Sequence, residues 1–189
     1  MQPVTLTTER LTLDTLSDAD VDAMTAYCQD PVLKDAVPIP WPYERQHADG
    51  FINGLAPEWW DEGSEYTWAI RETDASTLLG VIGFNVELAA IGYWMGEPHR
   101  GNGFMKEAAA EVARWAFSTG QPSIRWEAVV GNQPSASVAK SLGFIYTGTR
   151  PAIGKFRNDE HPLCWHATLT APGEIHSVEL HKLAAPWPV

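Results

Sequence analysis

A glycine-rich turn that joins an apolar segment to an amphipathic one constrains the fold of this chain most strongly. Residues 91–95, Ile-Gly-Tyr-Trp-Met, are apolar and aromatic, as in a buried strand. Residues 96–103 cannot continue that strand, because Pro98 lacks a backbone donor and two glycines bracket Asn102. From Met105 onward, apolar residues recur at helical spacing, at positions 108, 112, 113, 116 and 117. The sequence therefore predicts a strand, a tight turn and a helix in direct succession.

A turn of this kind is suited to binding an anion. It leaves backbone N–H groups unpaired at the start of a helix, where the helix dipole also favours a bound phosphate. Arg100 adds a fixed positive charge with a forked donor geometry. The turn matches neither the P-loop nor the dinucleotide fingerprint. The Gly-x-Gly sequence by itself also fits a tight turn that only reverses the chain and binds no anion.

Length and composition indicate one globular domain. The 189 residues, of which 44% are apolar and 20% charged, suffice for a full core. We expect the domain to span residues 1–170 and a proline-rich tail to follow over 171–189, packed loosely apart from Trp187. Cys28 and Cys164 lack the spacing of a metal site, so we expect no metal and reduced thiols in a cytoplasmic protein.

Charge and hydropathy limit the partners. The formal net charge of −11 argues against nucleic acid, because phosphate contacts need clustered Lys and Arg. The same charge would steer a cationic substrate such as an amine toward the protein, although solubility alone also explains it. We expect no membrane span and no secretion, because long apolar runs and a basic, apolar leader are absent from the sequence.

The order of the segments predicts the fold class. Strands are predicted at residues 9–13, 66–71, 78–86, 91–95, 123–130, 144–148 and 164–169. Helices are predicted at 17–29, at 45–55, at 105–119, and from Asn132 or Ser135 to Gly143. The strand at 123–130 follows a helix, so it should lie parallel to the strand at 91–95. We therefore expect an α/β (α+β) domain with a mixed sheet of about six to seven strands and helices on both faces.

An aromatic-rich loop is a candidate wall for a substrate pocket. Residues 36–44 contain three prolines, a density that excludes a helix interior and a central strand. The stiff loop carries Trp41 and Tyr43, and rigid loops with aromatic tips often bind ligands. Packing of these rings onto the domain is the alternative. Further wall candidates are Trp59, Trp60, Trp68 and Glu87.

Several motifs resemble one superfamily. Residues 100–105, Arg-Gly-Asn-Gly-Phe-Met, resemble the Arg/Gln-x-x-Gly-x-Gly/Ala pyrophosphate loop of the GNAT (Gcn5-related N-acetyltransferase) superfamily. Met105 in place of the final small residue is familiar in the Rim-type branch, which acetylates ribosomal-protein N-termini. Residues 132–144 resemble the "Asn-x-x-Ser … Leu-Gly-Phe" motif of the superfamily, and residues 8–13 resemble the "T-x-R-L-x-L" opening of the branch. With the hairpin residues Leu-Gly-Val-Ile-Gly-Phe, the resemblance covers roughly residues 5–169.

The resemblance implies a GNAT-type domain whose splayed parallel strands bind acetyl-CoA as co-substrate. It places the pyrophosphate on the backbone of Gly101, Asn102, Gly103, Phe104 and Met105, beside Arg100. It places the pantetheine arm on the backbone of Trp94 and Met95 on one side and on Asn132 on the other, and a backbone N–H near Met95 is the candidate donor to the thioester oxyanion. Ser137 and Lys140, in the second motif, complete the predicted cofactor-binding residues.

The resemblance also supplies catalytic candidates. An amine must lose a proton before it attacks, and related enzymes place a glutamate base at the strand position of Glu127. A salt-bridged carboxylate beside Arg125 is the alternative, with Glu87 and Glu65 as weaker candidate bases. Many members use a tyrosine to protonate the thiolate, but that position holds Ala139 here. In Rim-type enzymes a serine occupies the position of Ser135, which could also cap its helix.

The sequence thus predicts an N-acetyltransferase that acts by direct attack in a ternary complex. The acceptor is a primary amine, in a protein N-terminus or in a small molecule. A non-catalytic acyl-CoA-binding sensor or scaffold on the same fold is the alternative, and only the missing tyrosine supports it. A nucleotide-binding regulator is disfavoured because its motifs are absent. A homodimer would fit the branch.

Overall fold

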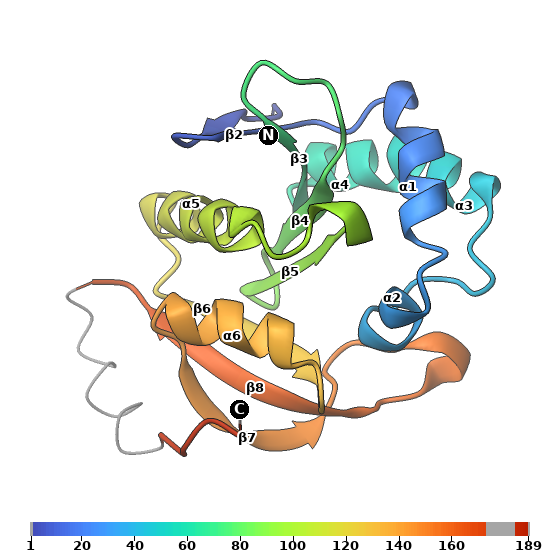
Figure 1. Cartoon of the computed structure of the whole chain (residues 1–189). Helices are drawn as coiled ribbons and strands as arrows, with labels where there is room; N and C mark the ends of the chain where they lie inside the picture. Colours follow the sequence, from blue (N-terminus) through green and yellow to red (C-terminus); the bar gives the residue numbers. More distant parts are fainter. Residues whose placement is uncertain (1, 173–183, 189) are drawn as a thin grey trace.

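A single mixed sheet organises the part of the chain that the computed structural model describes, residues 2–172 and 184–188. Its eight strands lie in the order β1-β2-β3-β4-β5-β6-β8-β7 (Figure 1). They are β1 (Leu6–Thr7), β2 (Leu11–Asp14), β3 (Glu65–Glu72), β4 (Gly80–Asn85), β5 (Ala90–Met95), β6 (Ser123–Val129), β7 (Ile145–Pro151) and β8 (Leu163–Thr170). All neighbouring strands are antiparallel except β5 and β6. The predicted mixed sheet with a parallel β5–β6 pair is confirmed, and the short edge strand β1 adds one strand to the seven predicted segments.

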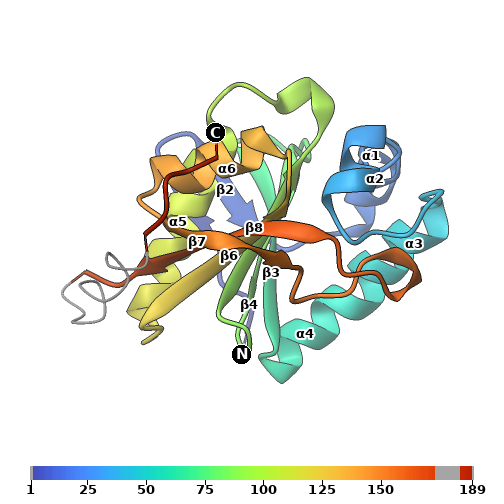
Figure 2. The ribbon, with the colours of Figure 1, turned by 90° about the horizontal axis from the view of Figure 1, so that it is seen from below.

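Helices cover both faces of the sheet, as predicted. They are α1 (Val21–Tyr27), α2 (Pro31–Ala36), α3 (Arg45–Gly50), α4 (Ala56–Glu62), α5 (Phe104–Ser118) and α6 (Gln133–Ser141). Short helical turns are η1 (Asp18–Asp20), η2 (Phe51–Leu55), η3 (Glu97–His99) and η4 (Arg157–Asp159). Figure 2 shows α5 and α6 on one side of the sheet and α1 to α4 on the other. The site described below lies where these two layers meet the β5–β6 gap.

The larger core lies between the helices α5 and α6 and the sheet, from β1 to β8. Its centre is aromatic: the ring centroid of Trp68 on β3 lies 5.1 Å from Trp115 on α5 and 5.2 Å from Trp60 on α4. Trp68 is fully buried, and its indole N–H donates to the Val4 carbonyl at 2.7 Å. The pocket-wall interpretation of Trp60 and Trp68 is therefore wrong, because the pleat of β3 directs Trp68 into the core.

The α3–α4 segment differs from its predicted end at residue 55. The helix continues through the π turn η2 into α4 and ends at Gly63, whose φ of 71° permits the left-handed cap. In the π turn, the Ala56 N–H donates to the Phe51 carbonyl. Pro57 follows directly, at a position where the first turn of α4 needs no N–H donor. The proline therefore does not terminate the helix. Pro31 also lies in the first turn of a helix. The helix α1 ends at Tyr27, and Pro31 begins the separate helix α2.

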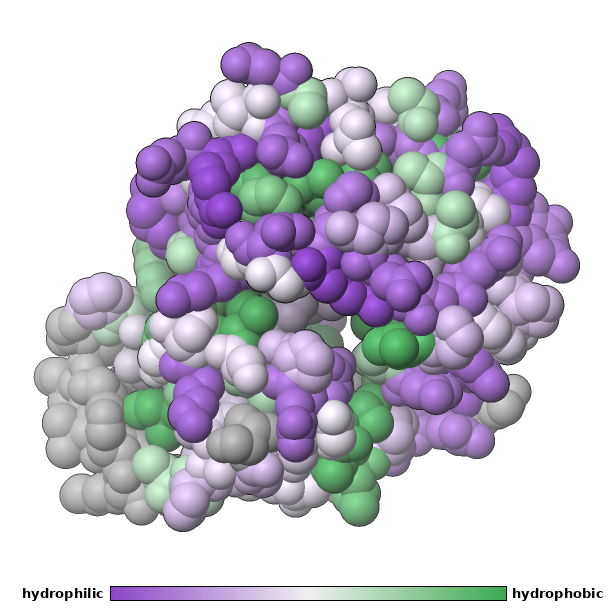
Figure 3. Space-filling view, in the orientation of Figure 1, coloured by the Kyte–Doolittle hydropathy of each residue, from purple (hydrophilic) through white to green (hydrophobic). Residues whose placement is uncertain are grey.

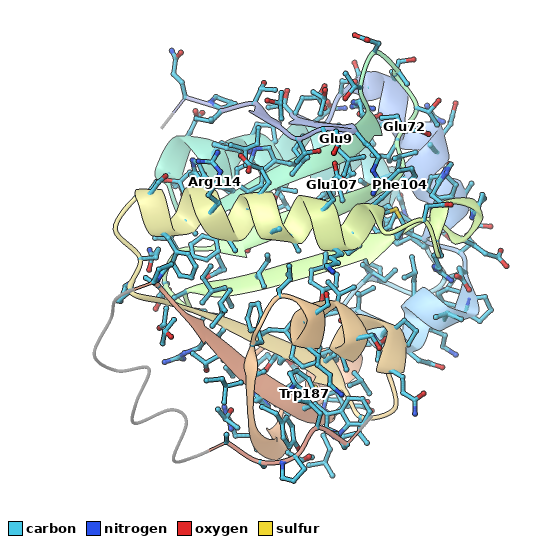
Figure 4. The ribbon with its side chains drawn as sticks, turned by 60° about the vertical axis from the view of Figure 1, so that its left-hand side comes forward. Glu9, Glu72, Phe104, Glu107, Arg114 and Trp187 are labelled. Carbon is cyan, nitrogen blue, oxygen red and sulfur yellow. The ribbon has the colours of Figure 1, made fainter. Side chains whose placement is uncertain are left out.

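Other local predictions agree with the structure. The segment after α2 forms no helix or strand before α3, as its prolines predicted. Trp187 in the tail packs against Trp126 and Tyr146, at ring-centroid distances of 5.8 and 5.6 Å (Figure 4). The rest of the tail prediction, residues 173–183 and 189, falls outside the described residues. Within them, no helix is long and apolar enough to cross a bilayer. Cys28 and Cys164 are buried free thiols, and burial raises the pKa of each to about 12.

Candidate active site

The parallel strands β5 and β6 separate soon after they begin. Their ladder contains one residue pair, Ala90 with Arg125, and the Arg125 N–H donates to the Ala89 carbonyl at 2.7 Å. No further ladder pair joins them within the described residues, although each pairs along its other edge, with β4 and β8. The two strands thus diverge toward their carboxyl ends and leave an unpaired backbone edge on each side. The predicted splayed pair is present.

Strand geometry determines which backbone groups face the gap. The N–H and C=O of one residue point to the same side of a strand, and successive residues alternate. The Ala89 carbonyl faces β6, whereas the Gly96 N–H faces the β4 side, where it bonds at 2.9 Å. The backbones of Tyr93 and Met95 therefore face the gap. The backbone of Trp94 faces β4, so the predicted backbone contact of Trp94 with the cofactor is wrong; only its side chain lines the cavity described next.

A cavity of about 1340 Å³ passes through the gap. On one side it is lined by residues 103–106 of the turn and by α6, and on the other by residues from the loop at 36–40 and from α3 and α4. Figure 3 shows the surface hollowed between the upper and lower halves of the molecule, with apolar residues at the edge of the hollow. Because the lining comes from both faces of the sheet, two molecules can meet in the gap from opposite sides.

The glycine turn presents its backbone to this cavity. Gly101 and Gly103 have φ values of 81° and 78°, a left-handed conformation that favours glycine. Gly103 is the N-cap of α5, and it has no side chain to cap the helix. The Glu107 N–H bonds back to the Gly103 carbonyl at 3.2 Å, so the amides of the preceding helical residues have no acceptor within the helix. The turn therefore leaves backbone amides open toward the cavity at a helix N-terminus, with the exposed Lys106 beside them, and its role as an anion site stays a prediction.

Arg100 is held by the protein itself. Its Nε donates to the Met95 carbonyl at 3.0 Å, and its Nη2 lies 2.6 Å from Asp30 Oδ2. Those two atoms are not aligned for a hydrogen bond, so charge attraction holds the pair. Asp30 also caps α2 by accepting from the Val32 N–H. Arg100 lines the cavity, but these contacts tie the turn to α2 and occupy part of the guanidinium that was predicted for phosphate.

Arg10 supports the turn from the other side. Its Cζ lies 4.9 Å from the centroid of the Phe104 ring, and its Nη1 donates to the Asn102 carbonyl at 3.2 Å. Its Nε donates to Glu107 Oε2 at 2.7 Å, and Thr8 also donates to the Glu107 carboxylate. Figure 4 shows Glu107 on α5 pointing toward β2. The opening motif at residues 8–13 thus fixes the turn, which explains physically why it accompanies the pyrophosphate-loop motif.

A hydrogen-bonded cluster joins β5, β6 and α6. Asn132 caps α6, since its Oδ1 accepts from the Ser135 N–H at 3.3 Å. The Ser135 hydroxyl donates to the Tyr93 phenol oxygen at 3.3 Å, and the Trp126 indole N–H lies within bonding distance of both oxygens. Burial raises the pKa of Tyr93 to about 12. Ser135 is therefore not the cap of its helix, and its hydroxyl faces Tyr93, a residue that the sequence did not identify.

Glu127 lies on β6, on the opposite face from this cluster. Its Oε2 accepts from the Ile153 N–H at 3.0 Å and lies 3.5 Å from His166 Nδ1 on β8. The side chain is one-quarter exposed and lines the cavity, on the side of α1 to α4. Burial, followed by the Arg150 charge, lowers the pKa of His166 and keeps the ring neutral at physiological pH. The structure thus brings a carboxylate and a neutral imidazole together on the α1 to α4 side of the gap.

The other predicted wall residues divide into two groups. Tyr43 and Trp59 line the cavity, with Phe51 packed edge-on against Trp59 at 5.7 Å. Trp41 lies outside the lining, and Lys34 sits 5.5 Å from its ring centroid. Glu87 is exposed on the turn between β4 and β5 and is also outside the lining. The wall prediction is therefore wrong for Trp41 and Glu87, because loop residues follow no period that reveals their direction.

The remaining predicted residues lie partly outside the cavity lining and partly within it. Ser137 and Lys140 are exposed on α6 and are not among the cavity-lining residues, so their cofactor role stays a prediction. Glu65, the weaker candidate base, does line the cavity, and its Oε2 accepts from Asn85 at 3.1 Å. No group of three or more His, Cys, Asp or Glu among the described residues could hold a metal ion.

Comparisons with known proteins identify acetyltransferases. A family model described as acetyltransferase (GNAT) domain matches residues 10–145. The uncharacterized N-acetyltransferase p20 of Bacillus licheniformis is 33% identical over 154 residues, which cover 76% of this chain and 84% of that protein.

Two solved structures share the fold. RimL, a ribosomal L7/L12 alpha-N-protein acetyltransferase in complex with coenzyme A, has a TM-score of 0.74 at 18% identity, over 90% of this chain and 100% of that one. The ribosomal-protein-S5-alanine acetyltransferase of Vibrio fischeri has a TM-score of 0.72 at 15% identity, over 90% of this chain and 98% of that one. At these identities the likeness concerns the fold, and at that level it agrees with the Rim-type resemblance of the sequence.

Proposed function

Since this chain belongs to the acetyltransferase (GNAT) family, we propose that it acetylates a primary amine by direct attack on acetyl-CoA in a ternary complex. Membership makes the chain an acyltransferase with acetyl-CoA as co-substrate, and the family and class predicted from the sequence are thereby confirmed. The acceptor and the roles of individual residues are the proposed part.

One observation carries the proposal: the cavity crosses the sheet through the β5–β6 gap. An open helix N-terminus lies on one side of it and the Glu127 carboxylate on the other. The amides of residues 101–105 are suited to the pyrophosphate, and the gap-facing backbone of Met95 and the edge of β6 near Asn132 are suited to the pantetheine amides. The acceptor would then enter from the side of α1 to α4, where Glu127 lies.

The chemistry follows from this placement. Glu127 accepts the proton of the acceptor ammonium, directly or through water, and the freed nitrogen attacks the thioester carbon. A gap-facing backbone N–H near Met95, that of Tyr93, donates to the developing oxyanion, because Tyr93 follows Gly92 and so lies level with Glu127. As the C–S bond breaks, the nitrogen of the tetrahedral intermediate loses its second proton through Ser135: the hydroxyl gives a proton to the thiolate sulfur, and its oxygen accepts the proton released by the nitrogen, directly or through water. Trp126 donates to the Ser135 oxygen and, together with Tyr93, positions it. The proposed products are an amide and CoA.

The acceptor class is proposed more broadly. The names of the structural neighbours state that they act on ribosomal proteins, so a peptide N-terminus is one acceptor to test here. A small amine is the other, and the net charge of −11 favours either cation. The cytoplasmic location and the homodimer stay predictions.

The test has two stages. Calorimetric titration of the purified protein with acetyl-CoA measures the cofactor site, and thiol release with a panel of amines and N-terminal peptides then measures transfer. Binding together with thiol release supports the proposal. Binding without release from any member of a broad panel favours the acyl-CoA sensor. Absence of binding would mean that this chain kept the fold without the ligand.

A further inference from the structure

A row of small residues leaves a hollow in the acceptor side of the sheet. Thr67 on β3 pairs with Gly83 on β4, which pairs with Gly92 on β5. Residues paired directly across antiparallel strands face the same side of the sheet. Neither glycine has a side chain, and the floor is open over Gly92, where an added Cβ would meet nothing within 4 Å, whereas the Glu65 carboxylate lies over Gly83. All three residues line the cavity.

The same row ends at Glu127 across the gap. Ala90 pairs with Arg125, so two residues further along each strand Gly92 lies level with Glu127. A molecule resting on the glycine floor therefore has Thr67 on one side and Glu127 on the other. It also lies against β5, the strand whose free edge borders the gap.

Two oxygen atoms point at the glycine floor. A Cβ placed on Gly83 would lie 3.0 Å from Glu65 Oε1 and 3.6 Å from Thr67 Oγ1. Glu65 Oε2 is engaged by Asn85, which leaves Oε1 facing the floor. Burial raises the pKa of Glu65, an effect that the bond from Asn85 partly opposes.

Thr67 carries the second, independent observation. The residue is 2% exposed, and its hydroxyl has no hydrogen-bond partner among the described residues. A buried polar group without a partner is rare and costly, and it marks a place where a ligand completes the bonding. Because Thr67 Oγ1 lies beside the Gly83 floor, such a ligand would sit in the hollow of the cavity.

Much of the wall around the hollow is apolar, although Arg125, two residues before Glu127 on β6, also lines the cavity. Phe51, Leu55 and Trp59 from η2 and α4 line this side of the cavity, together with Tyr43 and Leu88. A second charged group on a ligand would be buried here against aromatic and aliphatic side chains, which is unfavourable. The two oxygens match a group with several N–H donors, whereas a ligand carboxylate would be repelled by Glu65 and Glu127.

We propose that Glu65 and Thr67 bind the amino group of the acceptor over the Gly83–Gly92 floor, and that the acceptor is a primary monoamine with an aromatic or branched apolar body. This inference rests on the proposed function, which it deepens by naming the acceptor class. It assigns binding to Glu65 and leaves proton removal to Glu127. Polyamines, which carry further ammonium groups, are disfavoured.

The test measures binding rather than turnover. 2-Phenylethylamine is titrated calorimetrically into the full-length protein with saturating CoA, which carries no acetyl group to transfer. 2-Phenylethanol lacks the ammonium, and putrescine lacks the apolar body, so both serve as matched ligands. We expect 2-phenylethylamine to bind at least tenfold more tightly than either.

Substitutions at the proposed subsite test where 2-phenylethylamine binds. Glu65→Gln and Thr67→Val should each weaken 2-phenylethylamine at least tenfold, and Thr67→Val should keep or raise Tm because it removes an unpaired hydroxyl. Glu72→Gln, an exposed position at the other end of β3, is the matched control and should bind normally. Wild-type affinity in the Glu65 and Thr67 variants, preferred binding of putrescine, or no binding of 2-phenylethylamine would each overturn the proposal.

The two proposals can fail separately. If 2-phenylethylamine binds as described but acetyl-CoA yields no thiol release, the amine subsite stands and the transferase proposal fails. If thiol release occurs with other acceptors while 2-phenylethylamine does not bind, the transferase proposal stands and this subsite fails.

Discussion

The Glu127 carboxylate and the His166 imidazole face each other across the β6–β8 ladder, with Oε2 3.5 Å from Nδ1. His166 Nε2 lies 3.3 Å from the Arg150 carbonyl, which can only accept a hydrogen bond, so Nε2 carries the ring proton. Nδ1 therefore presents a lone pair to the carboxylate. A proton that reaches Glu127 from the acceptor can be shared with Nδ1, which would stabilise the protonated base.

Replacing the base tests its role. Glu127→Gln removes the proton acceptor but keeps an oxygen for the Ile153 N–H, so the fold and the acetyl-CoA affinity should change little. We expect kcat at neutral pH to fall by a factor of about 10² to 10⁴, the usual contribution of a general base. Steady-state thiol release, together with calorimetry for acetyl-CoA, measures both quantities.

The matched control for this change is Glu72→Gln, which alters an exposed strand carboxylate that does not line the cavity. Its rate should equal that of the wild type. A wild-type rate for Glu127→Gln across the pH range would show that Glu127 is not the base and would leave Glu65 as the candidate base.

His166 makes stability depend on pH. Its pKa is lowered by burial and then by Arg150, so the folded protein binds fewer protons at this ring than the unfolded chain does. The stability that the neutral His166 ring contributes is fully present above the pKa of about 6.5 in the unfolded chain. It is lost as the pH falls toward the lowered pKa in the folded protein. The free energy of unfolding in urea should therefore drop between pH 7.5 and pH 5. His166→Gln, which keeps an N–H donor, should show a smaller drop; an equal drop would contradict the assignment.

The strand–turn–helix units could be predicted because their signals are local. Apolar runs, glycines and a capping asparagine identify β5 with α5 and β6 with α6, and these two units build the gap and the anion site. Pairing partners far apart in the sequence could not be predicted. His166 lies opposite Glu127 only through the β6–β8 register, and Gly83 lies beside Gly92 only through the β4–β5 register.

The direction in which side chains point was the second feature that could not be predicted from the sequence. Trp59 and Trp68 are equally aromatic in the sequence, yet one lines the cavity and the other is core, because the pleat of β3 and the turn of α4 decide the face. Arg100 was predicted to contact the phosphate, and its additional attachment to Asp30 depends on the position of α2. Contacts of this kind are decided by tertiary packing, which the sequence does not show.

Gly103 tests the anion site. Gly103→Glu adds a negative side chain at the N-cap of α5, where a phosphate is expected, so acetyl-CoA affinity should fall at least a hundredfold. Any side chain is strained at its φ of 78°, and asparagine tolerates this conformation best. Gly103→Asn is therefore the control for backbone strain and should keep most of the affinity. Calorimetry measures both, and equal affinities for the two variants would contradict a pyrophosphate site at this turn.

Ser135→Ala tests the proton donor. The backbone N–H that Asn132 caps is retained, and the Trp126 indole keeps the Tyr93 oxygen as its acceptor at 3.0 Å, so the stability loss should be only about 1 kcal/mol. If Ser135 protonates the leaving thiolate, kcat should fall at least tenfold with KM for acetyl-CoA unchanged. The fall should be smaller for acyl donors with a more acidic thiol, because these need less protonation. A uniform loss across such donors would instead indicate that Ser135 only positions the site.

Arg10 tests whether the opening motif acts through the pyrophosphate turn. Its guanidinium stacks on Phe104 and bonds to both Asn102 and Glu107, and lysine cannot reproduce a planar, forked set of contacts. Arg10→Lys should therefore weaken acetyl-CoA several-fold while leaving KM for the amine unchanged, because the turn and not the acceptor side loses its support. Arg114→Lys alters an exposed arginine whose partner is Glu111, one turn away on the same helix, and is the matched control. Calorimetric affinities for acetyl-CoA would decide the matter: a loss confined to the Arg10 variant supports the positioning role, and an equal effect in both variants refutes it.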